Sequence, residues 1–472
     1  MSSQYERNAE QEIIRESIAK ARSAMQSIAN YTQEQINEMV TAVAWSLYKP
    51  ENARKMAELA VQTTKIGNVS DKVTKNQRKT FGTLRDLMRV KTVGIIEDSP
   101  HLGLVKYAKP VGVVAAITPS TNPSATPANK SMMALKGANS IILAPSPAGW
   151  KATSATAELM RNALAKVGAP PDLIQVLPAP VSRTMTKLLL EAADLVVATG
   201  SQTNVQNAYT SGTPAIGVGS GNVPVIIDET ANIKEAVYKI KASKTFDNAT
   251  SCSSENSLII LEDVYDTAMD ALIEAGAYRV PPEQNKEIEQ TLWVDGKLSR
   301  DLIARDPEVF ARGLNLGEEA SRASFYLIEQ PFFDANSLFA DEKLSLLLTI
   351  YKADNFNHAV QLVKNILLVN GRGHSCGIHT SRKERAAQLA TDVDVVRVLV
   401  NQAHTFGNGG SFENSLPFTL SMGCGTWGGN SISENLNYRH FINITHLVTT
   451  IDEDRPKEQE LFGAYLEKYG DD

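Results

Sequence analysis

A cysteine in polar surroundings is the first residue of this sequence whose type and position suit chemistry. Cys252 lies in DNATSCSSENS (247–257), among serine, threonine, asparagine and acidic residues. A free cysteine usually fills a gap in an apolar core, whereas a thiolate in a polar cleft is a strong nucleophile. The short segment alone leaves both interpretations open, so the choice depends on what the rest of the chain builds around the thiol.

Other candidate residues lie in turns. Asn122, in TPSTNP (118–123), precedes a proline, which is typical of a turn. Gly200 and Ser201 end an apolar run and open a helical pattern, so their backbone N–H groups suit a pyrophosphate as well as a plain turn. GVGSGN (217–222) looks like a dinucleotide-binding glycine motif, but it precedes an apolar run instead of following one, so it is a weak match.

The composition indicates a soluble protein of two or three domains. The chain has 472 residues, 43% of them hydrophobic and 21% charged, with a net charge of −6. Without a basic excess, nucleic acid is not an expected partner. Three cysteines, with neither disulfide nor zinc spacing, indicate a reducing cytoplasm and no metal site. We see no signal peptide and no apolar run long enough to span a membrane.

Short apolar runs that alternate with helical patterns predict a parallel sheet. Amphipathic helical patterns in 9–60 and a predicted hairpin at 92–110 come before them. The runs are VGVVAAIT (111–118), SIILAPS (140–146), LIQVLPA (173–179), DLVVATG (194–200) and VPVIIDE (223–229). Such a doubly wound α/β domain binds ligands at the carboxyl ends of its strands.

A second α/β set puts Cys252 near the join between two domains. Its runs are NSLIILED (256–263), LSLLLTIYKA (344–353), HSCGIHT (374–380) and VVRVLVN (395–401), with helical patterns between them. Cys252 directly precedes the first of these strands, and clefts between domains commonly hold sites. NYRHFINITHLVTTI, near the end of the chain, alternates and predicts a further strand.

A series of motifs runs through residues 10–450. It consists of TPSTNP, ALKGANSIILAPSP, VVATG, GVGSGNVPVIID, FDNATSCSSENS, EKLS, GHSCGIH and GCGTWGGNSISEN. In this order the set resembles the aldehyde dehydrogenase superfamily, and within it the CoA-acylating branch. The resemblance implies a cofactor-binding domain (1–91 and 110–229), a catalytic domain (230–435) and an oligomerisation element (92–109 and 436–450). A homo-oligomer, dimer or tetramer, is therefore expected.

The resemblance also implies roles for single residues. Cys252 matches the nucleophile, and Asn122, with the Cys252 N–H, matches the oxyanion donors. His374 matches a histidine that orients the aldehyde or thioester, although a structural hydrogen bond is the favoured alternative. The predicted cofactor-binding residues are Thr118, Pro119, Ser146, Lys151, Gly200, Ser201, Gly221 and Glu342. Glu342 matches the glutamate that reaches the nicotinamide ribose, and Cys376 and Cys424 are expected to be packing residues.

A missing glutamate predicts the type of reaction. Hydrolytic relatives carry a glutamate that activates water, and Val218 stands at the matching position here, with no carboxylate between Gly212 and Asn222. Without that base a thiol such as coenzyme A can attack the thioacyl enzyme instead. Glu255 is an alternative base, but its spacing favours a bond to the local backbone. A hydrolytic dehydrogenase and a non-catalytic nucleotide-binding scaffold are the competing hypotheses.

Cofactor and substrate are predicted from two further segments. SPAGWK (146–151) lacks the acid that repels a 2′-phosphate, which favours NADP over NAD.

The stretch 401–447 resembles the branches that act on sulfoacetaldehyde and succinate semialdehyde, with sulfoacetaldehyde first and acetaldehyde third. An anionic substrate needs hydrogen-bond donors, and TPSTNP and the backbone of 407–411 are the expected donors. Arg439 and His440 are expected to serve the subunit interface instead of binding the substrate.

Overall fold

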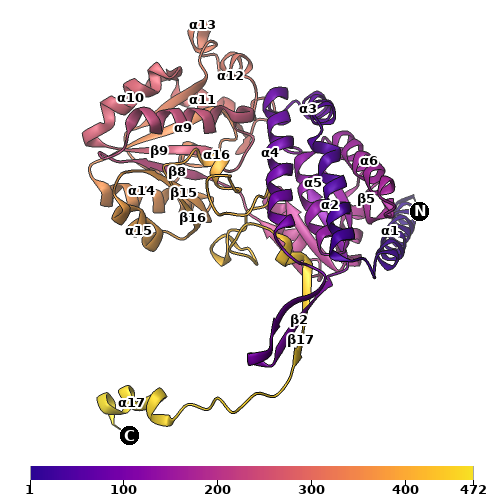
Figure 1. Ribbon diagram of the computed structural model, residues 1–472. Helices are drawn as coiled ribbons and strands as arrows, with labels where there is room; N and C mark the ends of the chain where they lie inside the picture. Colours follow the sequence, from indigo (N-terminus) through magenta and orange to yellow (C-terminus); the bar gives the residue numbers. More distant parts are fainter. Residues whose placement is uncertain (1, 471–472) are drawn as a thin grey trace.

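Two parallel sheets and a projecting arm make up the protein. The computed structural model describes residues 2–470. Figure 1 shows the two sheet-containing bodies side by side, with the arm and the C-terminal helix standing off from them. The α/β class predicted from the sequence is confirmed.

The first sheet has five parallel strands in the order β5-β4-β3-β6-β7. The strands are β3 (Val113–Thr118), β4 (Ser140–Pro145), β5 (Ile174–Val176), β6 (Leu195–Thr199) and β7 (Ala215–Val218). The residues of β3 and β4 are all buried, as expected for central strands covered on both faces.

Eight helices accompany this sheet among the described residues. They are α1 (Ser2–Ser27), α2 (Gln33–Tyr48), α3 (Pro50–Thr64), α4 (Val69–Met88), α5 (Ala125–Lys136), α6 (Trp150–Lys166), α7 (Arg183–Ala192) and α8 (Gln202–Tyr209). The start of α4 is fixed by Asn68, whose side chain accepts a hydrogen bond from the Asp71 N–H. Figure 1 shows α4 on the side of the first body that faces the second.

The second sheet has seven parallel strands in the order β10-β13-β14-β9-β8-β15-β16. The strands are β8 (Val223–Ile227), β9 (Glu255–Leu261), β10 (Ala277–Arg279), β13 (Phe325–Gln330), β14 (Leu347–Ala353), β15 (Gly373–His379) and β16 (Val395–Val400). Its helices are α9 (Ile233–Thr245), α10 (Tyr265–Glu274), α11 (Asn285–Leu292), α12 (Pro307–Gly313), α13 (Gly317–Ala320), α14 (Phe356–Val369), α15 (Lys383–Asp392) and α16 (His404–Gly407). A two-stranded ribbon, β11 (Trp293–Val294) and β12 (Lys297–Leu298), lies outside it.

Strand β8 differs from the expectation. The sequence places 223–229 in the first domain, but β8 pairs with β9 and β15 of the second sheet. All five of its residues are buried, and an apolar run of this kind fits either sheet equally well. The chain therefore crosses to the second sheet between β7 and β8, and not after residue 229.

The arm is a three-stranded antiparallel sheet in the order β1-β2-β17. The hairpin predicted at 92–110 forms β1 (Gly94–Ser99) and β2 (Leu104–Pro110), and the predicted late strand forms β17 (Ile442–Val448) on its other edge. Phe441, just before β17, is buried in the body, and its carbonyl accepts a hydrogen bond from Asn139. Beyond the arm, α17 (Glu458–Tyr469) stands apart (Figure 1). Among residues 2–470 no helix is long and apolar enough to cross a bilayer.

Candidate active site

Three loop residues meet because three neighbouring strands start at the same edge. Glu342, Cys252 and Gly221 precede β14, β9 and β8, which are adjacent and parallel. Parallel neighbours begin at a common edge of their sheet. Accordingly, all three residues line one small cavity together with Lys244 and Asn256.

The carboxyl ends of the first sheet supply the other residues of the site. Thr118 ends β3, and its carbonyl accepts the Ser146 N–H at 3.2 Å. Asn122 follows β3 and lines a second cavity together with Ser251 and Ser253, the two neighbours of Cys252 in the chain. Cys252 therefore lies between two cavities, one towards Glu342 and one towards Asn122.

The remaining predicted cofactor residues lie on the same edge of the first sheet. Gly200 follows β6 with a φ of 151°, and Ser201 caps α8 by accepting the Asn204 N–H. Pro119 is partly buried next to Thr118, and Lys151 is exposed in the first turn of α6. A larger hollow of about 800 Å³ lies between α1, α2 and the base of the arm, and Cys252 is not among its lining residues.

The Cys252 thiol is protonated at neutral pH in this structure. Burial raises its pKa to about 12, and the carboxyl of Glu342 contributes to the rise, while Arg397 and the Ser253 hydroxyl act against it. The residue as a whole is only partly buried, and it lines the small cavity next to Glu342. Nucleophilic attack therefore requires the thiol to lose its proton as the reactants bind.

Glu342 is also shifted towards its uncharged form. Burial and the neighbouring Asp341 raise its pKa to about 8. The Gly221 N–H, which donates a hydrogen bond to the carboxylate, acts in the opposite direction and lowers the pKa. Its Oε1 is buried without a hydrogen-bond partner among the described residues. A carboxyl oxygen facing the cavity without a partner is able to bind a ligand hydroxyl.

Gly221 permits a close backbone approach to Cys252. A Cβ at this position would lie 1.9 Å from the carbonyl oxygen of Cys252. Backbone cannot yield to such a contact without moving the loop. Only glycine therefore lets the loop before β8 pack against the cysteine loop.

Asn122 is held from helix α4. The Lys75 ammonium donates to Asn122 Oδ1 at 2.9 Å and to the Thr250 hydroxyl at 3.0 Å. Because the carbonyl oxygen of the amide accepts this bond, the amide nitrogen is the end left to donate. Its one contact within the described residues is a long bond of 3.4 Å to Thr121 Oγ1.

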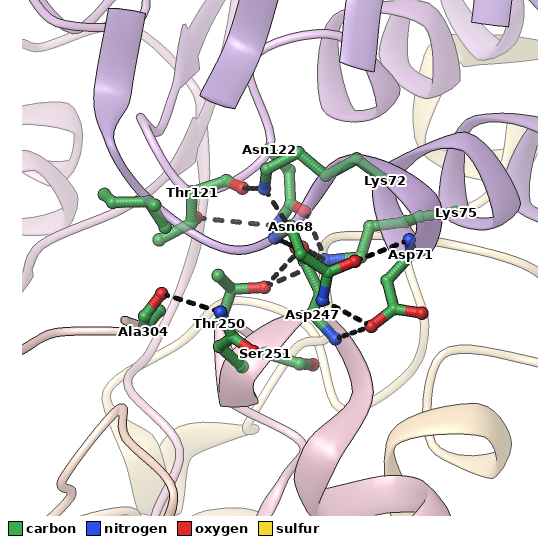
Figure 2. A network of polar contacts seen from close by, with 12 residues as sticks. Asn68, Asp71, Lys72, Lys75, Thr121, Asn122, Asp247, Thr250, Ser251 and Ala304 are labelled. Carbon is green, nitrogen blue, oxygen red and sulfur yellow. Dashed lines mark hydrogen bonds and ion pairs between the residues drawn. The ribbon is translucent and has the colours of Figure 1, made fainter. Parts of the chain in front are cut away.

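Asp247 ties α4 to the cysteine loop (Figure 2). Its fully buried carboxylate accepts hydrogen bonds from the Lys72 and Lys75 ammonium groups and the Thr250 hydroxyl. Burial alone raises the pKa of Asp247, but the two lysines outweigh it and hold the pKa below its usual value. The network joins the elements that carry Asn122 and Cys252.

The same loop has a strained backbone. Asp247, Asn248 and Ala249 have φ values of 52°, 53° and 60°, in the left-handed region. Residues other than glycine occupy this region at a cost of about 1 kcal/mol or more each, and persist there only when their surroundings enforce it. The hydrogen bonds of Asp247 are such an enforcing contact, five residues before Cys252.

Comparison with known proteins decides the family. The model of the aldehyde dehydrogenase family matches residues 4–293. The chain is also 46% identical over 454 residues to an acylating sulfoacetaldehyde dehydrogenase of Cupriavidus necator (strain H16), covering 96% of this chain and 92% of that protein. The chain belongs to the aldehyde dehydrogenase family.

Two further matches lie among acylating and acetylating members of that family. An acetylating succinate-semialdehyde dehydrogenase of Clostridium kluyveri is 39% identical, over 92% of this chain and 95% of its own length. The crystal structure of an acetylating aldehyde dehydrogenase from Geobacillus thermoglucosidasius superposes with a TM-score of 0.91 at 33% identity, covering 96% of this chain and 99% of that one. The predicted resemblance to acylating aldehyde dehydrogenases is confirmed.

His374 is not brought to either cavity of this aldehyde dehydrogenase. It lies fully buried at the start of β15, with Nδ1 on the Ser375 hydroxyl at 2.8 Å and with no partner for Nε2 among the described residues. Burial and Arg397 hold its pKa well below the usual value, so the ring is neutral. Of its two predicted roles, the buried position favours the structural hydrogen bond.

The helix residues of the site were not predicted from the sequence. Lys72, Lys75 and Lys79 recur at three and four residues along α4, which places them on one helix face. That face is buried, although basic residues at helical spacing normally mark a solvated surface. Two features of the sequence could have indicated a buried basic face on α4: this periodicity of the lysines, and the acid at position 247 in the cysteine motif.

Loss of the Asn122 amide is expected to reduce turnover. We expect Asn122→Ala to lower kcat by about 10²- to 10³-fold, because one donor to the developing oxyanion is removed. The measurement is the initial rate of reduced-cofactor formation at saturating aldehyde and CoA. Asn357→Ala, at an exposed position on α14, is the control and should retain the wild-type rate. A decrease of tenfold or less would assign Asn122 a structural role.

Proposed function

We propose that the protein oxidises sulfoacetaldehyde with NADP⁺ and coenzyme A to sulfoacetyl-CoA, NADPH and a proton. The observation that carries the proposal is the thiol of Cys252 between Asn122 and Glu342, with Val218 where hydrolytic relatives have their base. The acylating sulfoacetaldehyde dehydrogenase among the relatives supports the substrate. Succinate semialdehyde is the second candidate, supported by the acetylating enzyme that acts on it.

Cys252 and Asn122 carry the covalent steps in this proposal. The Cys252 thiolate adds to the aldehyde carbon, and the oxygen becomes an oxyanion held by the Asn122 amide and the Cys252 N–H. Bound NADP⁺ supplies the acceptor for the hydride that leaves this carbon. The CoA thiol then displaces Cys252 from the thioester and restores the free enzyme.

The surrounding carboxyls support transfer to CoA instead of water. Val218 ends β7, and Glu255 lines neither cavity: its Oε1 accepts the His404 N–H at 3.0 Å, and its Oε2 is buried without a partner among the described residues. Glu342 is the remaining acid, and we assign it to the nicotinamide ribose because its Oε1 is without a partner in the described residues. With no free base for water, hydrolysis of the thioester is slow.

The residues at the edge of the first sheet fit a dinucleotide. Thr118 Oγ1 is buried without a partner in the described part of the chain, and Gly200 and Ser201 present backbone N–H groups at the start of α8. The turn after β4 carries Ser146 and Lys151 and no acid, which supports NADP⁺ over NAD⁺. Competition between the two cofactors tests this choice, and a tenfold higher kcat/KM for NAD⁺ would contradict it.

Domain roles and assembly are part of the same proposal. The first sheet binds the cofactor, the second carries Cys252, and the arm joins copies into a homo-oligomer in the cytoplasm. Exposed Ile444, Leu447 and Val448 on β17 support a protein contact on the arm. Light scattering of the full chain tests the oligomer.

The dependence on CoA distinguishes the proposed reaction from hydrolysis. Without CoA we expect a burst of about one NADPH per Cys252 and then no further turnover, because the thioacyl enzyme has no acceptor. Addition of CoA should start continuous NADPH formation. Stopped-flow absorbance of the reduced cofactor measures both phases. Continuous turnover without CoA would identify a hydrolytic enzyme.

A further inference from the structure

The cavity on the Asn122 side of Cys252 has a basic wall. Lys75, Arg78 and Lys79 of α4 line it opposite Ser251 and Ser253. Lys79 lies close enough to Cys252 for its ammonium to interact with the thiolate form of the cysteine. The oxyanion donor and these basic groups therefore face one space next to the nucleophile.

Two of the three cations form no salt bridge among the described residues. Lys75 is paired with Asp247, as described above. Within residues 7–470, whose side chains the structure describes, the salt bridges of α4 are those of Lys72, Lys75 and Arg85, and none includes Arg78 or Lys79. The wall therefore carries positive charge that no salt bridge compensates, although the Glu413 carboxylate lies close enough to Arg78 to oppose the lowering of its pKa by burial.

Neutral acceptors hold both groups but leave donors unused. The Lys79 ammonium donates to the Gly409 carbonyl at 2.7 Å, and its side chain is only 8% exposed. Arg78 donates to the Ser411 hydroxyl at 3.2 Å and the Phe406 carbonyl at 3.4 Å, while its buried Nε has no partner in the described residues. An ammonium has three donors and a guanidinium has five, so both retain capacity for a ligand.

Burial of these charges is costly without an anion. Desolvation and the neighbouring Arg78 and Lys75 lower the pKa of Lys79 to about 7. An unpaired charge in a buried site destabilises the protein until a counter-charge arrives. An anionic ligand would remove this cost.

Aromatic rings fix the direction of the guanidinium. The Arg78 Cζ lies 5.3 to 5.7 Å from the ring centres of Phe406, Phe412 and Phe418. Stacked rings restrict a guanidinium while leaving its edge free to bind an oxyanion with two parallel hydrogen bonds. Such an edge matches the oxygen atoms of a sulfonate.

We propose that Arg78 and Lys79 bind the anionic group of the aldehyde and select substrates that carry one. The inference rests on the proposed oxidation at Cys252. Asn122 lines the same cavity as Arg78 and Lys79, so an aldehyde whose oxygen lies at Asn122 can direct a sulfonate on the adjacent carbon towards them. The sequence predicts that the backbone of 407–411 donates hydrogen bonds to the anion. The Gly409 carbonyl is an acceptor instead, and it accepts hydrogen bonds from the Lys79 ammonium and the Thr419 N–H.

The selectivity of Arg78→Met tests the proposal. The measured quantity is the ratio of kcat/KM for sulfoacetaldehyde to kcat/KM for acetaldehyde, at fixed CoA and NADP⁺, with succinate semialdehyde as a third substrate. We expect this ratio to fall by about 30-fold or more, the value of one charge-assisted hydrogen bond. Lys79→Gln should shift it in the same direction. An unchanged ratio in both variants overturns the proposal.

Arg85→Met is the matched control. Arg85 lies on the same helix and faces Phe412 and Phe418 at 5.3 and 4.9 Å, but it pairs with Asp86 and does not line the cavity. We expect this variant to keep the wild-type ratio. An equal fall in Arg85→Met would show a general effect of charge on α4 and would overturn the assignment.

A measurement on the unaltered enzyme covers the case in which the variants do not fold. Ethanesulfonate, which has no aldehyde, should slow alkylation of Cys252 by iodoacetamide, and ethanol at the same concentration should not. Equal alkylation rates overturn the proposal. If no aldehyde supports CoA-dependent NADPH formation, the proposed function is wrong. Protection of Cys252 by ethanesulfonate would still show that an anion binds next to it, because that experiment does not depend on turnover.

Discussion

Replacement of Cys252 by alanine is expected to abolish aldehyde oxidation. We expect kcat to fall by at least about 10⁴-fold, because no other group in the two cavities can form the thioester. The side chain is small and partly exposed, so the thermal unfolding temperature should change little. The measurement combines the rate of NADPH formation with mass spectrometry of the protein after exposure to aldehyde and NADP⁺, which should show an acyl adduct in the wild type alone.

Cys376→Ala provides the matched cysteine control. Cys376 lies in β15, fully buried in an apolar cluster. Its loss removes packing at a cost of about 1 kcal/mol, and the acyl adduct should still form. An adduct or wild-type turnover in Cys252→Ala would refute the covalent mechanism.

Asp247→Asn is expected to cause the largest loss of stability. The change keeps the shape of the side chain but leaves Lys72 and Lys75 buried without a counter-charge. Breaking a buried pair in this way costs about 3 to 5 kcal/mol in the free energy of unfolding. Urea unfolding monitored by circular dichroism measures the difference. Asp172→Asn, whose partner Arg161 is partly exposed, is the control and should cost less than about 1 kcal/mol.

The effect of Asp247 should depend on pH in a defined direction. Its folded pKa lies below the unfolded value of about 3.9. A group with a depressed folded pKa contributes stability above its unfolded pKa and loses that contribution as the pH falls through the folded pKa. The gap between wild type and Asp247→Asn should therefore narrow as the pH falls below about pH 4. A gap that widens in acid would contradict the assigned ion pair.

The sequence predicted the parts of the site that depend on local pattern. Apolar runs of seven to ten residues mark the buried strands, and Cys252 lies just before one of them. The meeting of Gly221, Cys252 and Glu342 follows from adjacent parallel strands, but the strand order itself depends on pairing across the whole chain. That is why β8 was assigned to the wrong sheet.

The cations of α4 show what local pattern misses. Whether a lysine at position 75 is solvated or buried depends on Asp247, 172 residues further along the chain. Periodicity places the lysines on one helix face but does not say what covers that face. The anion-binding role proposed for Arg78 and Lys79 depends on the same long-range packing.

The projecting arm determines where the chain can be altered without reaching the cavities. Phe441 anchors the start of β17 in the body, so a chain shortened to residue 441 keeps this core contact but exposes the outer edge of β2. A chain shortened after Val448 keeps all seven pairs between β2 and β17. Since α17 stands apart from both sheets (Figure 1), a tether joined there would immobilise the enzyme on a support at a point distant from both sheets.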